Sequence, residues 1–85
     1  MISIRFEKDY LYILGESILI LDWHIASELL ESVDFFIDGL DIDEQIGMLS
    51  VKSKNGFLVL QDKVRLDNKE CKELSGKLLQ WLVLG

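Results

Sequence analysis

The chain has 85 residues, a net charge of −6, 49% hydrophobic residues and one cysteine. This length suits one domain, so we expect residues 1–85 to form a single small α+β domain. The negative charge argues against direct binding of nucleic acid or of anionic membranes, because both require clustered Lys and Arg. We expect no signal peptide, because Glu7, Lys8 and Asp9 interrupt the apolar residues near the N-terminus. We expect no membrane span, because no apolar run approaches ~18 residues, and hence a cytoplasmic protein.

The beginning of the chain predicts three short strands. Apolar and polar side chains alternate over residues 2–7, as in a strand with one buried face. Residues 10–14 form a continuous apolar run rich in aromatic and branched side chains, which favours a strand covered on both faces. A turn containing Gly15 interrupts the apolar pattern, and residues 18–21 resume it as a third strand.

A helix is predicted to follow, between Asp22 and Gly39. Asp22 stands at the N-cap position, where a carboxylate can accept hydrogen bonds from free N–H groups of the first turn. Gly39 is suited to end the helix in the left-handed conformation. The apolar side chains between them recur at helical spacing: Ile25, Leu29, Val33 and Phe36.

The second half predicts a hairpin and a second helix. Asn55-Gly56 favours a tight turn between strands at residues 46–53 and 57–61, and residues 40–45 are expected to be a polar, acidic connection. Residues 64–66 lead to Asp67, which forms a capping box with Glu70. The apolar stripe of this helix contains Cys71, Leu74, Leu78 and Leu82.

These elements predict the order β-β-β-α-β-β-α. The fold class is α+β, with a mostly antiparallel five-stranded sheet and two helices on one face of it.

The charges are segregated along the chain. Residues 9–51 contain no Lys or Arg, and all nine basic residues lie outside this stretch. The same stretch holds ten acidic residues: Asp9, Glu16, Asp22, Glu28, Glu31, Asp34, Asp38, Asp41, Asp43 and Glu44. Like charges three or four residues apart destabilise a helix, and no basic residue of the first helix relieves them.

This pattern suggests a surface that binds another protein, although a merely solvated helix face is the simpler interpretation. The candidate binding residues are Glu28, Glu31, Asp34, Asp38, Asp41, Asp43, Glu44 and Trp23. A row of carboxylates can imitate nucleic-acid phosphates and occupy the groove of a basic, nucleic-acid-handling protein. The leading hypothesis is therefore a stoichiometric inhibitor or immunity-type protein, such as a phage-encoded blocker or the partner of a nuclease toxin.

Two other functions compete with this hypothesis. The alternative is a structural homodimerisation or adaptor domain without catalytic activity, whose apolar interface includes Trp81 and Leu84. An enzyme using His24 with Glu28 or Asp22 is the third candidate. No Ser or Cys stands at a catalytic spacing from His24, so we expect no enzyme, no catalytic residues and no cofactor.

A metal site and a reactive thiol are also considered. Asp41-Ile42-Asp43 has the spacing that opens a calcium loop, but Ile46 and Lys52 replace the required Gly and Glu, so no metal is expected. Cys71 stands beside Lys69 and Lys72, which would lower the pKa of its thiol. Its position on the apolar stripe favours packing instead.

Overall fold

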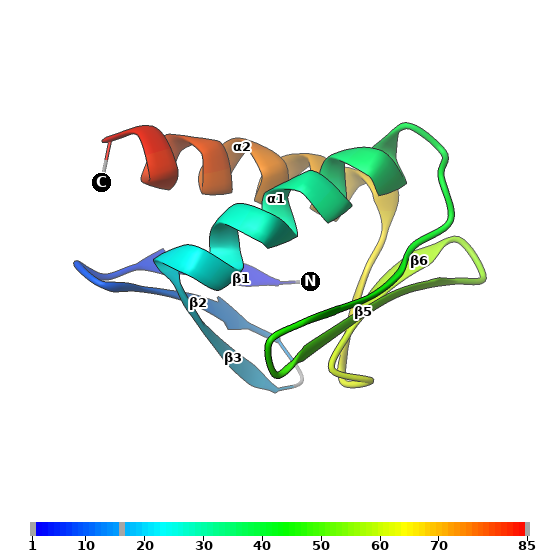
Figure 1. Ribbon diagram of the computed structural model, residues 1–85, viewed down its shortest axis with the longest axis horizontal. Coiled ribbons are helices and arrows are strands. Elements are labelled where there is room, and N and C mark those ends of the chain that lie inside the picture. The colour runs from blue at the N-terminus through cyan, green and yellow to red at the C-terminus, as the bar shows by residue number, and fades with distance from the viewer. Residues whose placement is uncertain (1, 16, 85) are drawn as a thin grey trace.

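The chain folds into two antiparallel sheets beneath a pair of helices (Figure 1). This computed structural model describes residues 2–15 and 17–84. The first sheet contains β1 (Ser3–Phe6), β2 (Tyr10–Leu14) and β3 (Ile18–Asp22), in that order. The second contains, also in order, β4 (Asp43–Ile46), β5 (Leu49–Lys54), β6 (Phe57–Leu60) and β7 (Val64–Leu66). The helices are α1 (Trp23–Ile37), between the sheets in the sequence, and α2 (Asn68–Leu84).

The two helices pack against each other and run in opposite directions, and the sheets diverge below them (Figure 1). The α+β class is therefore confirmed. Neither helix in the described part of the chain is long and apolar enough to cross a bilayer.

The prediction of one five-stranded sheet is wrong, because the strands divide into a three-stranded and a four-stranded sheet. Sequence analysis places residues 43–45 in a connection, residue 46 at the start of the strand 46–53, and residues 64–66 in a lead to the last helix. In the structure, residues 43–46 form β4 and residues 64–66 form β7. β4 pairs with β5, and β7 pairs with β6. Because β5 and β6 also pair with each other, neither has a free edge for the strands of the first half.

The predicted first helix is confirmed at both ends. The side chain of Asp22 accepts a hydrogen bond of 2.8 Å from the backbone N–H of Ile25. Asp38 is the C-cap, and Gly39 follows it with φ of +93°. The buried side of the helix carries Ala26, Leu29, Ser32 and Val33.

The hairpin and the second capping box are also confirmed. Asn55 and Gly56 both have positive φ, and Lys54 lies opposite Phe57. At the start of α2, the N–H of Glu70 donates to Asp67 Oδ1 at 2.7 Å, and the N–H of Asp67 donates to Glu70 Oε1 at 3.1 Å.

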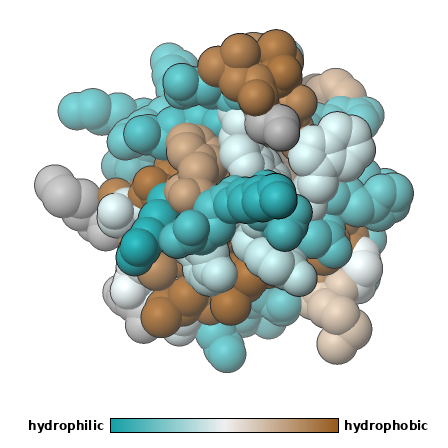
Figure 2. Space-filling view, turned by 90° about the vertical axis from the view of Figure 1, so that its left-hand side faces the viewer, coloured by the Kyte–Doolittle hydropathy of each residue, from teal (hydrophilic) through white to brown (hydrophobic). Residues whose placement is uncertain are grey.

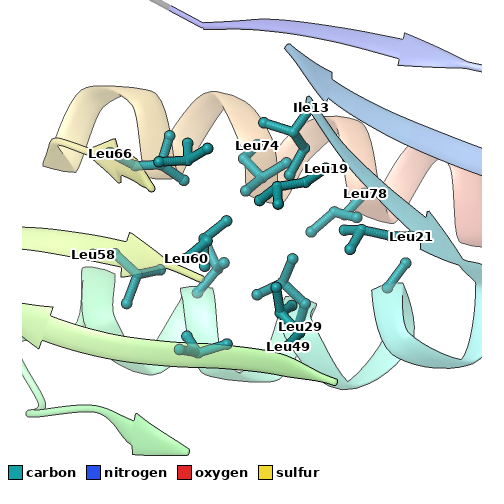
Figure 3. Packing of buried hydrophobic residues seen from close by; sticks show 14 of the residues in the cluster. Ile13, Leu19, Leu21, Leu29, Leu49, Leu58, Leu60, Leu66, Leu74 and Leu78 are labelled. Atoms are coloured by element: carbon teal, nitrogen blue, oxygen red, sulfur yellow. The ribbon is translucent and has the colours of Figure 1, made fainter. Parts of the chain in front are cut away.

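The core is one cluster of buried apolar side chains from both helices and both sheets. Figure 3 shows Leu29 of α1 close to Leu49 of β5, with leucines from α2 and from both sheets around them. The helices thus join the two sheets, which do not pair with each other along their edges.

Candidate functional site

The candidate site is an acidic surface on α1 and the segment that follows it. We define the acidic surface as the seven carboxylates Glu28, Glu31, Asp34, Asp38, Asp41, Asp43 and Glu44, all of which are exposed. Four of them lie on α1 or at its C-cap, and the last two begin β4. At a rise of ~1.5 Å per residue, the four helical carboxylates span about 15 Å along the helix axis.

Two carboxylates of the acidic surface form hydrogen bonds with neighbouring elements. Ser32 of α1, which is buried, donates to Glu44 Oε2 at 2.6 Å and so ties β4 to the helix. Ser75 of α2 donates to Asp34 Oδ1 at 2.5 Å, across the contact between the two helices. Glu44 and Asp34 therefore have structural contacts that Glu28 and Glu31 lack.

The acidic surface has no paired cation within the described ranges 2–15 and 17–84. No Lys or Arg there forms an ion pair with any of the seven carboxylates, whereas Arg5 Nε lies 3.3 Å from Glu7 Oε1 in the first sheet. The nearest approach in strand register is Lys52, which lies opposite Asp43 in the β4–β5 pair. Glu16, another acidic residue of the stretch 9–51, lies outside the described residues.

The placement of these carboxylates on α1 is unfavourable for the helix itself. The first turn contains no acidic residue and the last turn contains no basic residue. Asp34 and Asp38 instead stand at the C-terminal end, where the helix dipole is negative. Each carboxylate placed there costs about 0.3–1 kcal/mol at an exposed position. Helix stability therefore does not explain why these residues are acidic.

Trp23 lies at the other end of α1 from most of the acidic surface. Its side chain is 54% exposed at the first helical residue, about 22 Å along the axis from Asp38. The structure thus leaves Trp23 exposed, as predicted, and separates it by most of the length of α1 from Asp38. His24 is also exposed beside it, and the carboxylate of Asp22 is used in capping the helix.

Residues missed by sequence analysis form a basic face on the outer side of the second sheet. Lys52, Lys54 and Arg65 point away from the core, and the guanidinium of Arg65 lies 5.6 Å from the centre of the Phe57 ring. Lys54 and Arg65, together with Lys63 and Asp62, border a shallow hollow of about 690 Å³. The strand register could have indicated this face, because Lys52 lies opposite Val59, which in turn lies opposite Arg65.

No metal-binding cluster is formed by the described part of the chain. No group of three or more His, Cys, Asp or Glu side chains is close enough to hold an ion among residues 2–15 and 17–84.

The prediction that Cys71 is a packing residue is confirmed, and its thiol pKa is raised despite the neighbouring Lys69 and Lys72. Its side chain is fully buried, and the thiol donates weakly to the carbonyl of Leu66 at 3.9 Å. Burial raises the pKa of the thiol from 9.0 to about 12, and the negative charges of Asp67 and Glu70 add to this effect.

This raised pKa predicts a loss of stability in alkali. Above pH 9.0 the thiol of the unfolded chain loses its proton, whereas the thiol of the folded chain keeps it. The stability that the buried neutral thiol contributes below pH 9.0 is therefore lost as the pH rises towards 12. The free energy of unfolding should fall by about 1.4 kcal/mol per pH unit from this group. Urea denaturation of wild type and Cys71→Ala at several pH values measures the difference. An equal pH dependence of the two proteins would contradict the prediction.

The two residues of the predicted apolar interface differ in exposure. Trp81 is 7% exposed and its ring stacks on Phe6 of β1, with 6.3 Å between ring centres and an interplanar angle of 16°. Leu84 is exposed, as is Val83. Figure 2 shows hydrophobic side chains gathered at the end of the molecule where α2 ends, beside hydrophilic ones. Trp81 thus belongs to the core of its own chain.

Comparison with known proteins gives no relative: no family model, no curated protein and no solved structure matches the chain.

Proposed function

We propose that this protein is a binding module that uses its acidic surface to occupy a basic groove on another protein. A stoichiometric inhibitor or an immunity-type protein acts in this way, by covering a groove that would otherwise receive nucleic acid. The proposed partner is a basic, nucleic-acid-handling protein or complex, and the proposed action needs no catalytic residue, cofactor or metal.

The supporting observation is that none of the seven carboxylates of the acidic surface forms an ion pair with a Lys or Arg of residues 2–15 and 17–84, and only Asp43 has a lysine, Lys52, opposite it in the strand register. One of the seven, Asp38, stands where the helix dipole opposes a negative charge, so its charge does not serve the stability of α1. The carboxylates also recur along the helix axis, as phosphates do along a nucleic-acid strand, but at a wider spacing. The four helical carboxylates are about 5 Å apart along the axis on average, against about 3.4 Å per phosphate in one strand of DNA.

The decisive variant is the double charge reversal Glu31→Lys with Asp38→Lys. The side chains of Glu31 and Asp38 do not form hydrogen bonds of the kind that Asp34 and Glu44 make. A cation at the C-terminus of a helix is also favourable. The free energy of unfolding of the variant should therefore equal or exceed that of the wild type. Loss of close charge pairs at an interface should weaken binding by about 100-fold or more. Affinity capture from cell lysate, followed by mass spectrometry of the retained proteins, measures this change.

A matched control separates the position of the charge from its amount. The variant Asp9→Lys with Glu73→Lys also exchanges two exposed acids for lysine, so both variants change the net charge from −6 by the same amount. We expect the control variant to retain the partner. We also expect added duplex DNA to displace the partner from the wild-type protein, because DNA and the acidic surface would occupy the same groove. Equal capture by wild type and by Glu31→Lys with Asp38→Lys would refute the proposal.

A further inference from the structure

The second sheet has two unlike sides. Both helices pack against its inner side, where the apolar side chains of β5, β6 and β7 are buried (Figure 1). Successive side chains of a strand lie on opposite faces, so those that alternate with the buried ones point outward. The outward side chains of these three strands include three cations and one aromatic ring: Lys52, Lys54, Arg65 and Phe57.

Positive charge predominates on this outer side. Its four basic residues are the three cations of the basic face and, in the turn before β7, a fourth: Lys52, Lys54, Arg65 and Lys63. Two acidic residues accompany them, Asp43 opposite Lys52 in the strand register and Asp62 next to Lys63 in the chain. None of the four cations forms an ion pair with a residue of 2–15 or 17–84. This excess of positive charge is complementary to an anionic partner.

Phe57 adds a planar apolar group among these cations. Its side chain is 38% exposed, and the guanidinium of Arg65 lies 5.6 Å from the centre of its ring. The hollow of about 690 Å³ opens beside Phe57 and is bordered by Lys54, Lys63 and Arg65. Aromatic rings and guanidinium planes are the surfaces on which unpaired nucleobases stack. The hollow therefore combines a stacking surface with cations at its border.

We propose that the outer side of the second sheet binds single-stranded nucleic acid. Proteins bind single strands by combining a positively charged surface, which follows the backbone, with aromatic side chains on which the bases stack. Here Phe57 and Arg65 receive a base, and Lys52, Lys54 and Lys63 receive the phosphates. An acidic peptide would pair with the cations but has no flat ring for Phe57, so the exposed ring favours the nucleic acid.

The net charge of −6 does not prevent this contact. The carboxylates of α1 belong to the helical layer, which lies across the second sheet from the basic face (Figure 1). Charges that are farther apart than the Debye length, about 8 Å at physiological salt, are largely screened. The expectation of no direct nucleic-acid contact rested on the absence of clustered Lys and Arg in the sequence, and the strand register supplies that cluster. The proposal is independent of the proposed role of the acidic surface.

The test is the fluorescence anisotropy of a labelled deoxythymidine dodecamer titrated with the protein. Each phosphate contact adds about −0.7 to the slope of log K against log salt, so four contacts predict an affinity about 50-fold lower at ~200 mM than at ~50 mM salt. Lys54→Gln with Arg65→Gln should bind more weakly and lose only about 7-fold over the same range. Lys69→Gln with Lys72→Gln is the matched control, because both lysines are exposed on α2 and the same two charges are removed. This control should bind as wild type does.

Phe57→Leu separates stacking from charge. This variant keeps all four cations, so the salt dependence should stay the same while the loss of a stacked base weakens binding by about 10-fold or more. Circular dichroism establishes that each variant is folded.

A comparison of probes needs no variant. A labelled glutamate dodecamer has a similar charge and no bases, so it should bind wild type more weakly than the deoxythymidine dodecamer does. Equal binding of the two probes would indicate an acidic protein partner and would overturn the proposal. Failure of wild type to bind the deoxythymidine dodecamer, or undiminished binding by folded Phe57→Leu or by Lys54→Gln with Arg65→Gln, would also overturn it.

Discussion

Trp81→Ala is expected to lower the free energy of unfolding by about 3–5 kcal/mol, the usual cost of deleting a buried tryptophan side chain. Trp81 lies in the last third of α2 and stacks on Phe6, so its ring connects the end of this helix to the first sheet. The stacked pair contributes about 0.5–1.5 kcal/mol beyond the burial of area. A protein of this size has a total stability of about 5–15 kcal/mol, so the variant should be close to unfolding.

Urea denaturation followed by circular dichroism measures this loss. Val83→Ala is the control, because Val83 is exposed two residues further along the same helix, and its effect should stay within about 0.5 kcal/mol. Trp81→Ala should leave the association state of the folded protein unchanged. Separation into monomers without loss of stability would show instead that Trp81 lies between subunits.

Leu29→Ala is expected to cost about 2–5 kcal/mol. Leu29 is fully buried on α1 and lies beside Leu49 in the region where the helices meet the second sheet (Figure 3). The sheets share one core without sharing a strand pair, so we expect this loss to appear in both sheets together, as one cooperative transition.

Two signals distinguish cooperative from separate unfolding. Hydrogen exchange of β2 reports on the first sheet and that of β5 on the second, and both should reach the same free energy of opening in Leu29→Ala. Leu40→Ala, at an exposed position after α1, is the control and should change little. Loss of protection in one sheet alone would contradict the shared core.

Sequence analysis is most successful where a structure depends on neighbours in the chain. The α1 boundaries follow from the carboxylate of Asp22 and the glycine at position 39, and the hairpin register follows from Asn55-Gly56. The capping box of Asp67 and Glu70 is likewise a contact over three residues. Each of these features is decided within one or two turns of the chain.

The candidate site is only partly predictable in the same way. The exposure of Glu28, Glu31 and Asp34 agrees with the helical spacing of α1. The position of β4 against α1 could not be foreseen, because it depends on where the segment after α1 turns back. The contact between Ser32 and Glu44 has the same origin.

The amino-acid sequence by itself determined the α+β class, the two helices with their caps, the central hairpin and the segregation of acidic from basic residues. Only the tertiary structure decided that the strands divide into two sheets, since Asp43 and Glu44 are poor strand formers and β4 exists through its backbone pairing with β5. It also decided that Trp81 is buried and that Lys52, Lys54 and Arg65 share a face. The physical reason is the same in each case: these features come from contacts between segments far apart in the chain, which local spacing and propensity do not encode.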